Sequence, residues 1–340
     1  MVHTASSNQN GSYQAIVARY KDRFETYVLN SVQNNQVYSP LSKFFSIGFH
    51  VQRLDRISVA RSKSTFVSLS NGQAKVFSVL EEKQLYNQKQ FQAQSKDEIL
   101  VDVSMHPSGM FLAGAFFTGF RVYAILQNGF QLIKHVDLIW CSIVQYSSRA
   151  RYLLTNEKNN VCVYDAIHYQ LLFVFNCHEK LVQRIIVMED QMTVVSFCNG
   201  GDLMLWKIVD KMKVFQKQEY EKKEQVVVYK HKTEVLYADF IYLQKQDLFV
   251  ATSEEANLIV YTNNCKKLQM KYTDMSCRFE SFQFDDANLI LMVATSTGSL
   301  RSYCISDWKF DPSDPFQDLT ELPFREFKIS SFSISNLVFF

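Results

Sequence analysis

Short apolar stretches recur along the chain, and each ends in an aliphatic residue followed by an aromatic one. The recurring pairs are Val37-Tyr38, Val76-Phe77, Val122-Tyr123, Val163-Tyr164, Leu205-Trp206, Val260-Tyr261 and, as a weaker copy, Ser302-Tyr303. The aromatic residues follow one another at steps of 39, 46, 41, 42, 55 and 42 residues. Regular steps of this size indicate a fold built from repeated units.

Each unit contains several short β-type runs joined by turn residues. Residues 66–70 precede Asn71-Gly72, and residues 193–197 precede a turn that contains Gly200 and Gly201. Such runs predict hairpins, because tight turns need residues that tolerate a positive φ. A third run lies upstream, as at residues 99–105, and a fourth follows several units, as at residues 171–175. The pattern therefore predicts four strands per unit.

A four-stranded unit that is apolar on both faces must be covered by neighbouring units. Steps of about 40–45 residues are also typical of WD-type propeller blades. We therefore predict an all-β, WD40-like β-propeller with about seven four-stranded blades and degenerate repeats. The predicted blade limits are 13–50, 54–96, 99–139, 141–178, 181–231, 234–275 and 278–327. Residues 1–12 are expected to form a flexible tail, and 13–327 the propeller.

The end of the chain, residues 328–340, carries one more predicted strand over residues 328–335. This strand either pairs with the first blade or begins a truncated further blade. The repeats also depart from the usual WD pattern. No Gly-His pair precedes a first strand, and the Trp-Asp ending is reduced to Tyr164-Asp165. Apolar packing between blades is therefore expected to hold the units together.

Composition supports a large core and gives little reason to expect a polyanionic partner. Of the 340 residues, 47% are hydrophobic, and 36 Lys and Arg residues face 34 Asp and Glu residues, for a net charge of +2. Nucleic acid is therefore not an expected partner. The seven cysteines form no C-x-x-C pair, which favours reduced intracellular thiols. Neither a signal peptide nor a membrane-spanning apolar run is visible, so we expect a soluble protein without a membrane partner.

No motif with recognisable catalytic spacing is present. The stretch from Cys198 to Asp202 lacks the Gly-Lys-Ser/Thr of a phosphate loop, so it predicts a hairpin turn. Cys177-His178 has no second pair of ligands at zinc spacing. The carboxylate pairs Asp285-Asp286 and Glu254-Glu255 fall in predicted turns. The sequence thus predicts a non-enzyme with no catalytic residues, cofactor, metal or small-molecule substrate.

A basic segment accounts for the long step of 55 residues. Between positions 211 and 232 it holds seven lysines against three glutamates. The candidate partner-docking residues are Lys211, Lys213, Lys217, Lys222, Lys223, Lys230 and Lys232, which would suit an acidic partner. The alternative is a fourth blade strand with a solvated extension, because charge runs commonly face water.

Two units resemble the WD-repeat cilia- and flagella-associated proteins. The resemblance rests on residues 101–126, with their His-Pro-Ser-Gly turn, and on the Thr-Ser-x-Gly-x-x-Arg pattern at residues 295–301. It implies a non-catalytic scaffold of the ciliary axoneme that docks near inner dynein arms and helps to regulate ciliary motility. The implied partners are dynein-arm or tubulin-associated subunits, and the implied location is cytoplasm, cytoskeleton and cilium axoneme.

Two alternatives stay open. The first is a general cytoplasmic or nuclear WD-repeat adaptor for protein complexes. The second is an enzyme with its site in the central channel, which requires charged groups that converge at the starts of blade strands. The sequence shows too few such groups to favour this alternative.

Overall fold

In the computed structural model of the 340-residue chain, the fold is described for a set of ranges that cover every strand. These ranges are 13–19, 24–30, 42–47, 56–60, 65–78, 83–84, 98–126, 129–176, 178–188, 193–207, 227–232, 237–243, 246, 248–253, 255–262, 267–274, 276–285, 289–308, 317–319, 324–328 and 336–339. Within them no helix is long and apolar enough to cross a membrane.

The described strands form seven small sheets, which we number as blades in chain order. Blade 1 holds β29 (Asn336–Phe339), β1 (Tyr13–Arg19), β2 (Phe24–Asn30) and β3 (Ser42–Ile47). Blade 2 holds β4 (Arg56–Ala60), β5 (Thr65–Ser70), β6 (Gln73–Ser78) and β7 (Lys83–Gln84). Blade 3 holds β8 (Leu100–Met105), β9 (Phe111–Phe116), β10 (Gly119–Leu126) and β11 (Gly129–Asp137). Blade 4 holds β12 (Val144–Tyr146), β13 (Tyr152–Glu157), β14 (Asn160–Asp165) and β15 (Leu171–Asn176).

The last three blades follow the same order. Blade 5 holds β16 (Val182–Met188), β17 (Thr193–Cys198), β18 (Asp202–Lys207) and β19 (Val227–Lys232). Blade 6 holds β20 (Tyr237–Leu243), β21 (Leu248–Ser253), β22 (Asn257–Thr262), β23 (Lys267–Thr273) and β27 (Gln317–Leu319). Blade 7 holds β24 (Phe279–Asp285), β25 (Ile290–Thr295), β26 (Ser299–Cys304) and β28 (Arg325–Lys328), with the 3-10 turn η3 (Ile305–Asp307) after β26.

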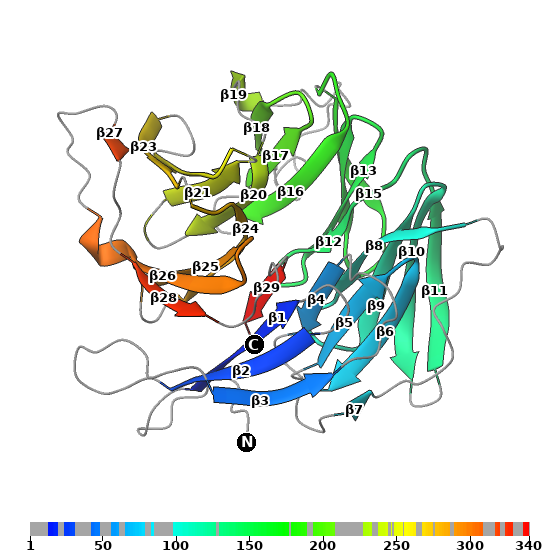
Figure 1. Cartoon of the computed structure of the whole chain (residues 1–340). Helices are drawn as coiled ribbons and strands as arrows, with labels where there is room; N and C mark the ends of the chain where they lie inside the picture. The colour runs from blue at the N-terminus through cyan, green and yellow to red at the C-terminus, as the bar shows by residue number, and fades with distance from the viewer. Residues whose placement is uncertain are drawn as a thin grey trace.

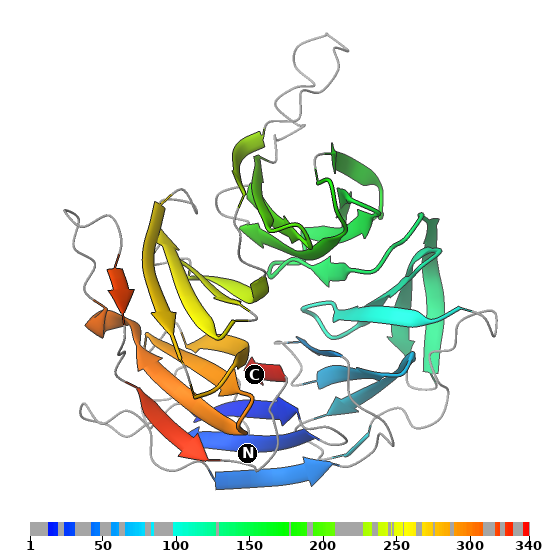
Figure 2. The same ribbon diagram turned by 45° about the horizontal axis from the view of Figure 1, so that its top comes forward.

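The blades follow one another around a common axis, with their first strands innermost (Figures 1 and 2). The first strands of neighbouring blades contact each other, as β4 contacts β8 and β20 contacts β24. β29 contacts both β24 and β4, so it occupies the first-strand position of blade 1. The fold is therefore an all-β, WD40-like β-propeller with four-stranded blades, to one of which, blade 6, β27 adds a fifth strand.

The C-terminal strand differs in position from the one that the sequence predicts. Residues 328–335 were expected to form it, whereas Lys328 ends β28 of blade 7 and β29 begins at Asn336. β29 pairs antiparallel with β1, with Val17 opposite Val338. The apolar Leu-Val-Phe run of 337–339 suits a strand between two neighbours better than the serine-rich 328–335 run does. β27 is a second difference, because it pairs with β23 of blade 6 although the predicted limits place it in blade 7.

The recurring aromatic residues lie on the third strands, and in blades 1, 3, 4, 5 and 6 the pairing with the fourth strand shifts by one residue at that position. This β-bulge falls between Val122 and Tyr123 in blade 3 and between Leu205 and Trp206 in blade 5. Blade 1 has the same shift between Thr26 and Tyr27. We therefore assign Tyr27 as the first aromatic copy in place of Tyr38, which lies outside the described residues.

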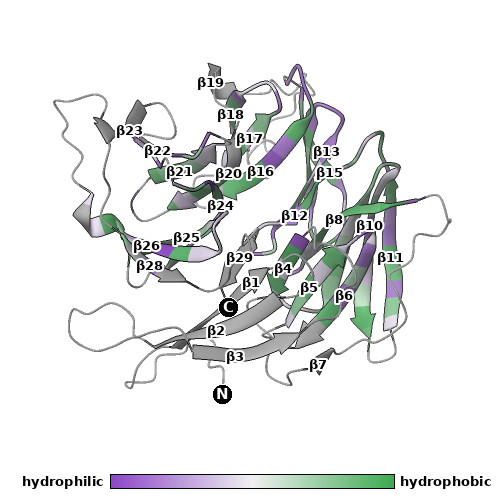
Figure 3. Cartoon of the chain, viewed as in Figure 1, coloured by the Kyte–Doolittle hydropathy of each residue, from purple (hydrophilic) through white to green (hydrophobic). Residues whose placement is uncertain are grey.

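Aromatic side chains fill the interfaces between blades. The pairs that cross from one blade to the next are Phe120–Tyr164, Phe175–Trp206, Phe197–Phe240 and Tyr272–Phe279, with ring centroids 4.9, 4.9, 5.0 and 6.3 Å apart. Offset and edge-on ring pairs at such distances stabilise a core beyond the area that they bury. Hydrophobic residues, in green, accordingly make up much of the described strands (Figure 3). The predicted apolar packing between blades is confirmed.

Polar side chains join the first strands of blades 2, 3 and 4. Ser58 Oγ accepts a hydrogen bond from the backbone N–H of Met105 at 2.9 Å. Ser104 Oγ accepts from the N–H of Tyr146 at 3.0 Å in the same way. These bonds satisfy backbone donors on the strand edge that faces the axis, where no neighbouring strand can accept them.

Pairing of β29 with β1 predicts a large effect from a small truncation. A chain shortened to end at Ser335 loses β29, and β1 keeps an unpaired edge in the middle of the fold. We expect the free energy of unfolding, measured by urea denaturation, to fall by several kcal/mol at roughly 1 kcal/mol for each lost ladder hydrogen bond. Removal of residues 1–12 is the control and should change little if they form the predicted tail. Equal stability of the shortened and complete chains would contradict the role assigned to β29.

Candidate functional site

The seven candidate docking lysines fall into two groups. Lys211, Lys213, Lys217, Lys222 and Lys223 lie outside the described residues. Lys230 and Lys232 lie on β19, the fourth strand of blade 5, opposite Met204 and Asp202 of β18. The last part of the basic segment is thus a blade strand, and docking by these lysines stays a prediction.

Charged side chains converge at the axis, where the first strands begin. Arg56, Asp102, Arg184 and Asp239 lie on β4, β8, β16 and β20. Hydrophilic segments of β4 and β16 stand out within their largely apolar surroundings (Figure 3). The sequence did not reveal this convergence, because each charge is a single residue in an apolar run.

A β-bulge places three of these four residues. The pairing of the first with the second strand shifts between Leu100 and Asp102, between Val182 and Arg184, and between Tyr237 and Asp239. A bulge turns the following side chain in a new direction. Asp102, Arg184 and Asp239 each follow such a shift, and the repeated bulge therefore sets a ring of polar positions at the axis.

The axial charges form two ion pairs between neighbouring blades. Arg56 Nε lies 3.2 Å from Asp102 Oδ1, and Arg184 Nη2 lies 2.8 Å from Asp239 Oδ1. Asp102 also accepts a hydrogen bond from the N–H of Val144 at 3.0 Å, which joins blade 3 to blade 4. The Asp102 carboxylate raises the pKa of Arg56, but burial and the nearby positive charge of Arg184 outweigh it and leave the pKa below its ordinary value.

Exposed apolar side chains gather on the side of the ring where the first strands begin, which we call the entry face. We define the entry-face apolar surface as Ile99, Phe117, Ile139, Trp140 and Leu181, all of which are largely exposed. Phe117 lies in the β9–β10 turn, and the other four lie in the segments that lead into β8, β12 and β16. Because both kinds of connection meet at one end of a blade, these side chains belong to the same face.

Trp140 is held firmly within this surface by its contacts with Phe117. Its indole lies edge-on to the Phe117 ring at 5.3 Å, and the backbone N–H of Trp140 donates to the Phe117 carbonyl at 2.9 Å. The N–H of Lys158 donates to the neighbouring carbonyl of Ile139 at 3.0 Å. Trp140 has a φ of 57°, a left-handed conformation that is costly for a bulky residue. More than half of the surface of Trp140 remains open to solvent, at 54%.

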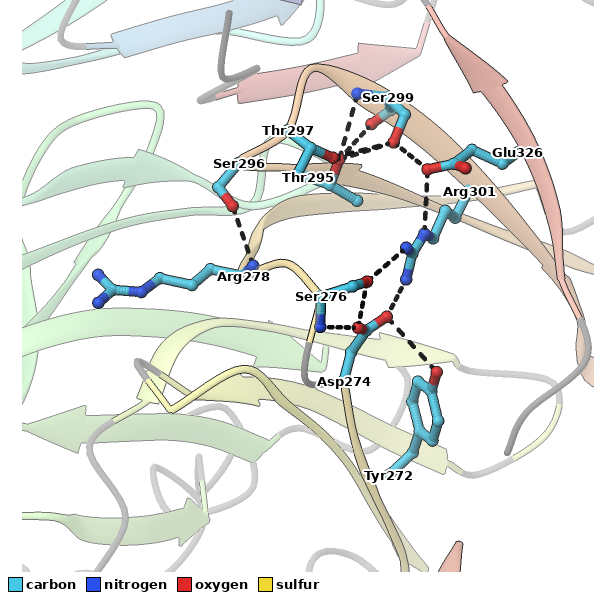
Figure 4. A network of polar contacts seen from close by, with 10 residues as sticks. All are labelled: Tyr272, Asp274, Ser276, Arg278, Thr295, Ser296, Thr297, Ser299, Arg301 and Glu326. Carbon is cyan, nitrogen blue, oxygen red and sulfur yellow. Dashed lines mark hydrogen bonds and ion pairs between the residues drawn. The ribbon is translucent and has the colours of Figure 1, made fainter. Parts of the chain in front are cut away.

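A buried polar network joins blades 6 and 7 (Figure 4). Arg301, on β26, forms an ion pair with Asp274, which lies between β23 and β24, and a second with Glu326 of β28 at 3.4 Å. Ser276 donates to Asp274 Oδ1 through both its N–H and its hydroxyl at 2.6 Å. Although burial raises the pKa of Asp274, the hydrogen bonds from Ser276 and Arg301 lower it to about 2.

Blade 3 contains a counterpart of this network. Arg121 occupies the same place on β10 as Arg301 does on β26, and its Nη2 lies 2.7 Å from the Glu98 carboxylate. Each guanidinium also lies over a ring, Arg121 over Phe116 at 4.4 Å and Arg301 over Phe324 at 4.2 Å. In both blades an acid ahead of the first strand is therefore joined to the third strand through a buried arginine.

Blade 5 makes the same connection with different residues. Trp206 Nε1 donates to Ser196 Oγ at 2.9 Å, and His178 Nε2 lies 2.7 Å from the same oxygen. His178, Cys198 and Asp202 are buried, and their ligand atoms all lie within 4.8 Å of one another. These residue types can bind zinc. Because Ser196 already engages His178 and Trp206, we interpret the group as a cross-link between strands. His178 thus makes the link ahead of the first strand that the missing Gly-His pair would be expected to make.

These features define a WD40-like β-propeller with an exposed apolar surface and charged pairs at its axis. No protein-family model matches the chain. Over 212 residues it is 23% identical to the WD repeat-containing protein 55 homolog of Drosophila willistoni, a match that spans 61% of this chain and 39% of that protein. Among solved structures it is similar to the Cps50 (Swd1) beta-propeller domain of Myceliophteria thermophila, with a TM-score of 0.62 and 10% identity over 82% of this chain and 92% of the other.

The network in blades 6 and 7 predicts a specific response to mutation and pH. In Asp274→Asn, Glu326 is the counter-charge that Arg301 keeps among the described residues, so the free energy of unfolding should fall by about 3 kcal/mol. The lowered pKa of Asp274 stabilises the fold above its unfolded pKa near 3.8, and this contribution is lost as the pH falls towards about 2. Urea denaturation between pH 5 and 2.5 should therefore show a weaker acid dependence in Asp274→Asn. An unchanged acid dependence would contradict the ion pair.

Proposed function

We propose that the chain is a non-catalytic interaction module that binds protein partners through its entry face. The observation that carries the proposal is the entry-face apolar surface, of which Trp140 is part. Contiguous exposed apolar side chains on a folded protein are typical of interaction sites. Tryptophan is also the residue type most enriched among those that dominate binding energy at interfaces.

The backbone around Trp140 supports this proposal. A bulky residue at positive φ costs free energy, and such strain persists where the surroundings hold it in place. Here the bonds from Trp140 to Phe117 and from Lys158 to Ile139 hold it. A ring presented in one fixed position loses little conformational entropy on binding. The strain is thus explained by a need to present the indole outward.

The polar groups of the described residues fit a scaffold better than an enzyme. Charged residues do converge at the axis, as the enzyme alternative requires. However, Asp102, Asp239, Asp274 and Glu98 are each in an ion pair with an arginine. Burial raises the pKa of the Cys141 and Cys162 thiols to about 12, and their thiolates are therefore strongly disfavoured at neutral pH.

The proposal predicts that Trp140→Asn separates binding from stability. Asparagine tolerates a positive φ, so this variant should melt at or above the temperature of the unchanged chain. Its capture of protein partners from cell extract, measured by quantitative mass spectrometry with the chain as bait, should fall at least tenfold. The control is Ile167→Ser, which alters a residue that is 75% exposed in the β14–β15 turn on the opposite face. Equal losses in both variants, or no loss in Trp140→Asn, would contradict docking at the entry face.

We further propose, from the resemblance of residues 101–126 and 295–301, that the module works in the ciliary axoneme near inner dynein arms. The WD repeat-containing protein 55 homolog is a WD-repeat protein whose name does not refer to cilia. A general adaptor in cytoplasm or nucleus is the second candidate, because the similarity to this relative supports a WD-repeat protein without a ciliary role.

Proximity labelling in ciliated cells distinguishes the two candidates. A tagged chain in the axoneme should label dynein-arm and tubulin-associated subunits above the level seen with a free labelling enzyme. A tagged Trp140→Asn variant should label them less if the entry face makes the contact. Enrichment of nuclear or cytosolic complexes with no axonemal subunit would contradict the ciliary proposal and favour the general adaptor.

A further inference from the structure

The two axial arginines present more of their surface to solvent than their acidic partners do. The side chains of Arg56 and Arg184 are 25% and 28% exposed, whereas those of Asp102 and Asp239 are 8% and 13% exposed. A group that approaches along the axis therefore meets the guanidinium groups before it meets the carboxylates.

The carboxylates are also the more fully engaged groups. Asp102 accepts from Val144 N–H through Oδ2 while Oδ1 pairs with Arg56. Asp239 Oδ1 accepts from the N–H of Phe240 at 3.0 Å in addition to its pair with Arg184. A guanidinium has five N–H donors. Among the residues that the structure describes, one nitrogen of each axial arginine takes part in an ion pair, and each side chain keeps about a quarter of its surface open to solvent.

The two arginines influence each other across the ring. They lie on β4 and β16, the first strands of blades 2 and 5, which stand on different sides of the axis (Figure 2). The positive charge of Arg184 acts on Arg56 and helps to lower its pKa. A negative group between the two guanidiniums would relieve this repulsion and accept their remaining hydrogen bonds.

We propose that Arg56 and Arg184 together bind one carboxylate, supplied by an acidic side chain of a protein partner that docks on the entry face. The proposal rests on the function proposed above. The four axial charges sum to zero, so a single negative charge suits the site better than a phosphate with two. A protein is the expected source because Leu181, part of the entry-face apolar surface, lies three positions before Arg184. The carboxylate would anchor a partner whose apolar residues contact the surface around Trp140.

The test measures binding of a fluorescein-labelled octaglutamate peptide to the complete chain by fluorescence anisotropy in 0.15 M salt. Arg56→Gln with Arg184→Gln should weaken binding at least tenfold. Asp239→Asn removes the carboxylate that competes for Arg184 and should tighten binding several-fold, a change that loss of folding cannot imitate. Arg149→Gln is the control, because Arg149 is exposed in the β12–β13 turn at the opposite end of the blade from the entry face, and its affinity should not change.

The outcomes decide between the proposal and its rivals. No binding by the unchanged chain, or equal binding by all variants, overturns the axial site. Competition by inorganic phosphate more strongly than by acetate at equal concentration overturns the carboxylate in favour of a phosphate ligand. Circular dichroism shows whether the double glutamine variant folds. If it does not, two other variants test the site: the double variant Arg56→Lys with Arg184→Lys, and the single variant Asp239→Asn. Failure here leaves the partner capture that depends on Trp140 untouched, so the two proposals can fail separately.

Discussion

The first strand of every blade has one edge that no other strand can pair, because that edge faces the axis of the ring. The rest of the structure depends on how those backbone groups are satisfied. Ser58 and Ser104 accept N–H groups of the next blade, and Asp102 does the same for Val144. Each bond also fixes the spacing of two neighbouring blades. The polar residues in these otherwise apolar strands are thus explained by the backbone groups that they satisfy, without any appeal to function.

In blades 3, 5 and 7 a second polar link joins the segment ahead of the first strand to the third strand. Blades 3 and 7 do this with a buried arginine and an acid, while blade 5 uses His178, Ser196 and Trp206. The chemistry differs but the connected positions are equivalent. Degenerate repeats can therefore keep one architecture, because the fold requires a satisfied polar link at that place and does not require one particular set of residues.

The sequence was sufficient to predict the architecture, because the repeated aromatic residue and the hairpin turns depend on local patterns. It could not place the first aromatic copy, where Tyr27 takes the position expected of Tyr38, since only the bulge in strand pairing identifies it.

The axial charges were missed for a similar reason. Arg56 and Asp102 are 46 positions apart and become neighbours only when blades pack. Trp140 carries no motif, and its exposure follows from the backbone turn that holds it. The basic segment was visible in the sequence, but most of it lies outside the described residues.

The pairing of β29 with β1 also bears on how the chain is made. Val17 and Val338 meet across 321 positions, so the first blade remains incomplete until nearly all of the other blades have emerged from the ribosome. During that interval β1 presents an open strand edge that can pair with other chains. Contacts between such distant segments also form slowly, because a long loop must close first. The protein is therefore expected to depend on chaperones during synthesis more than its finished stability would suggest.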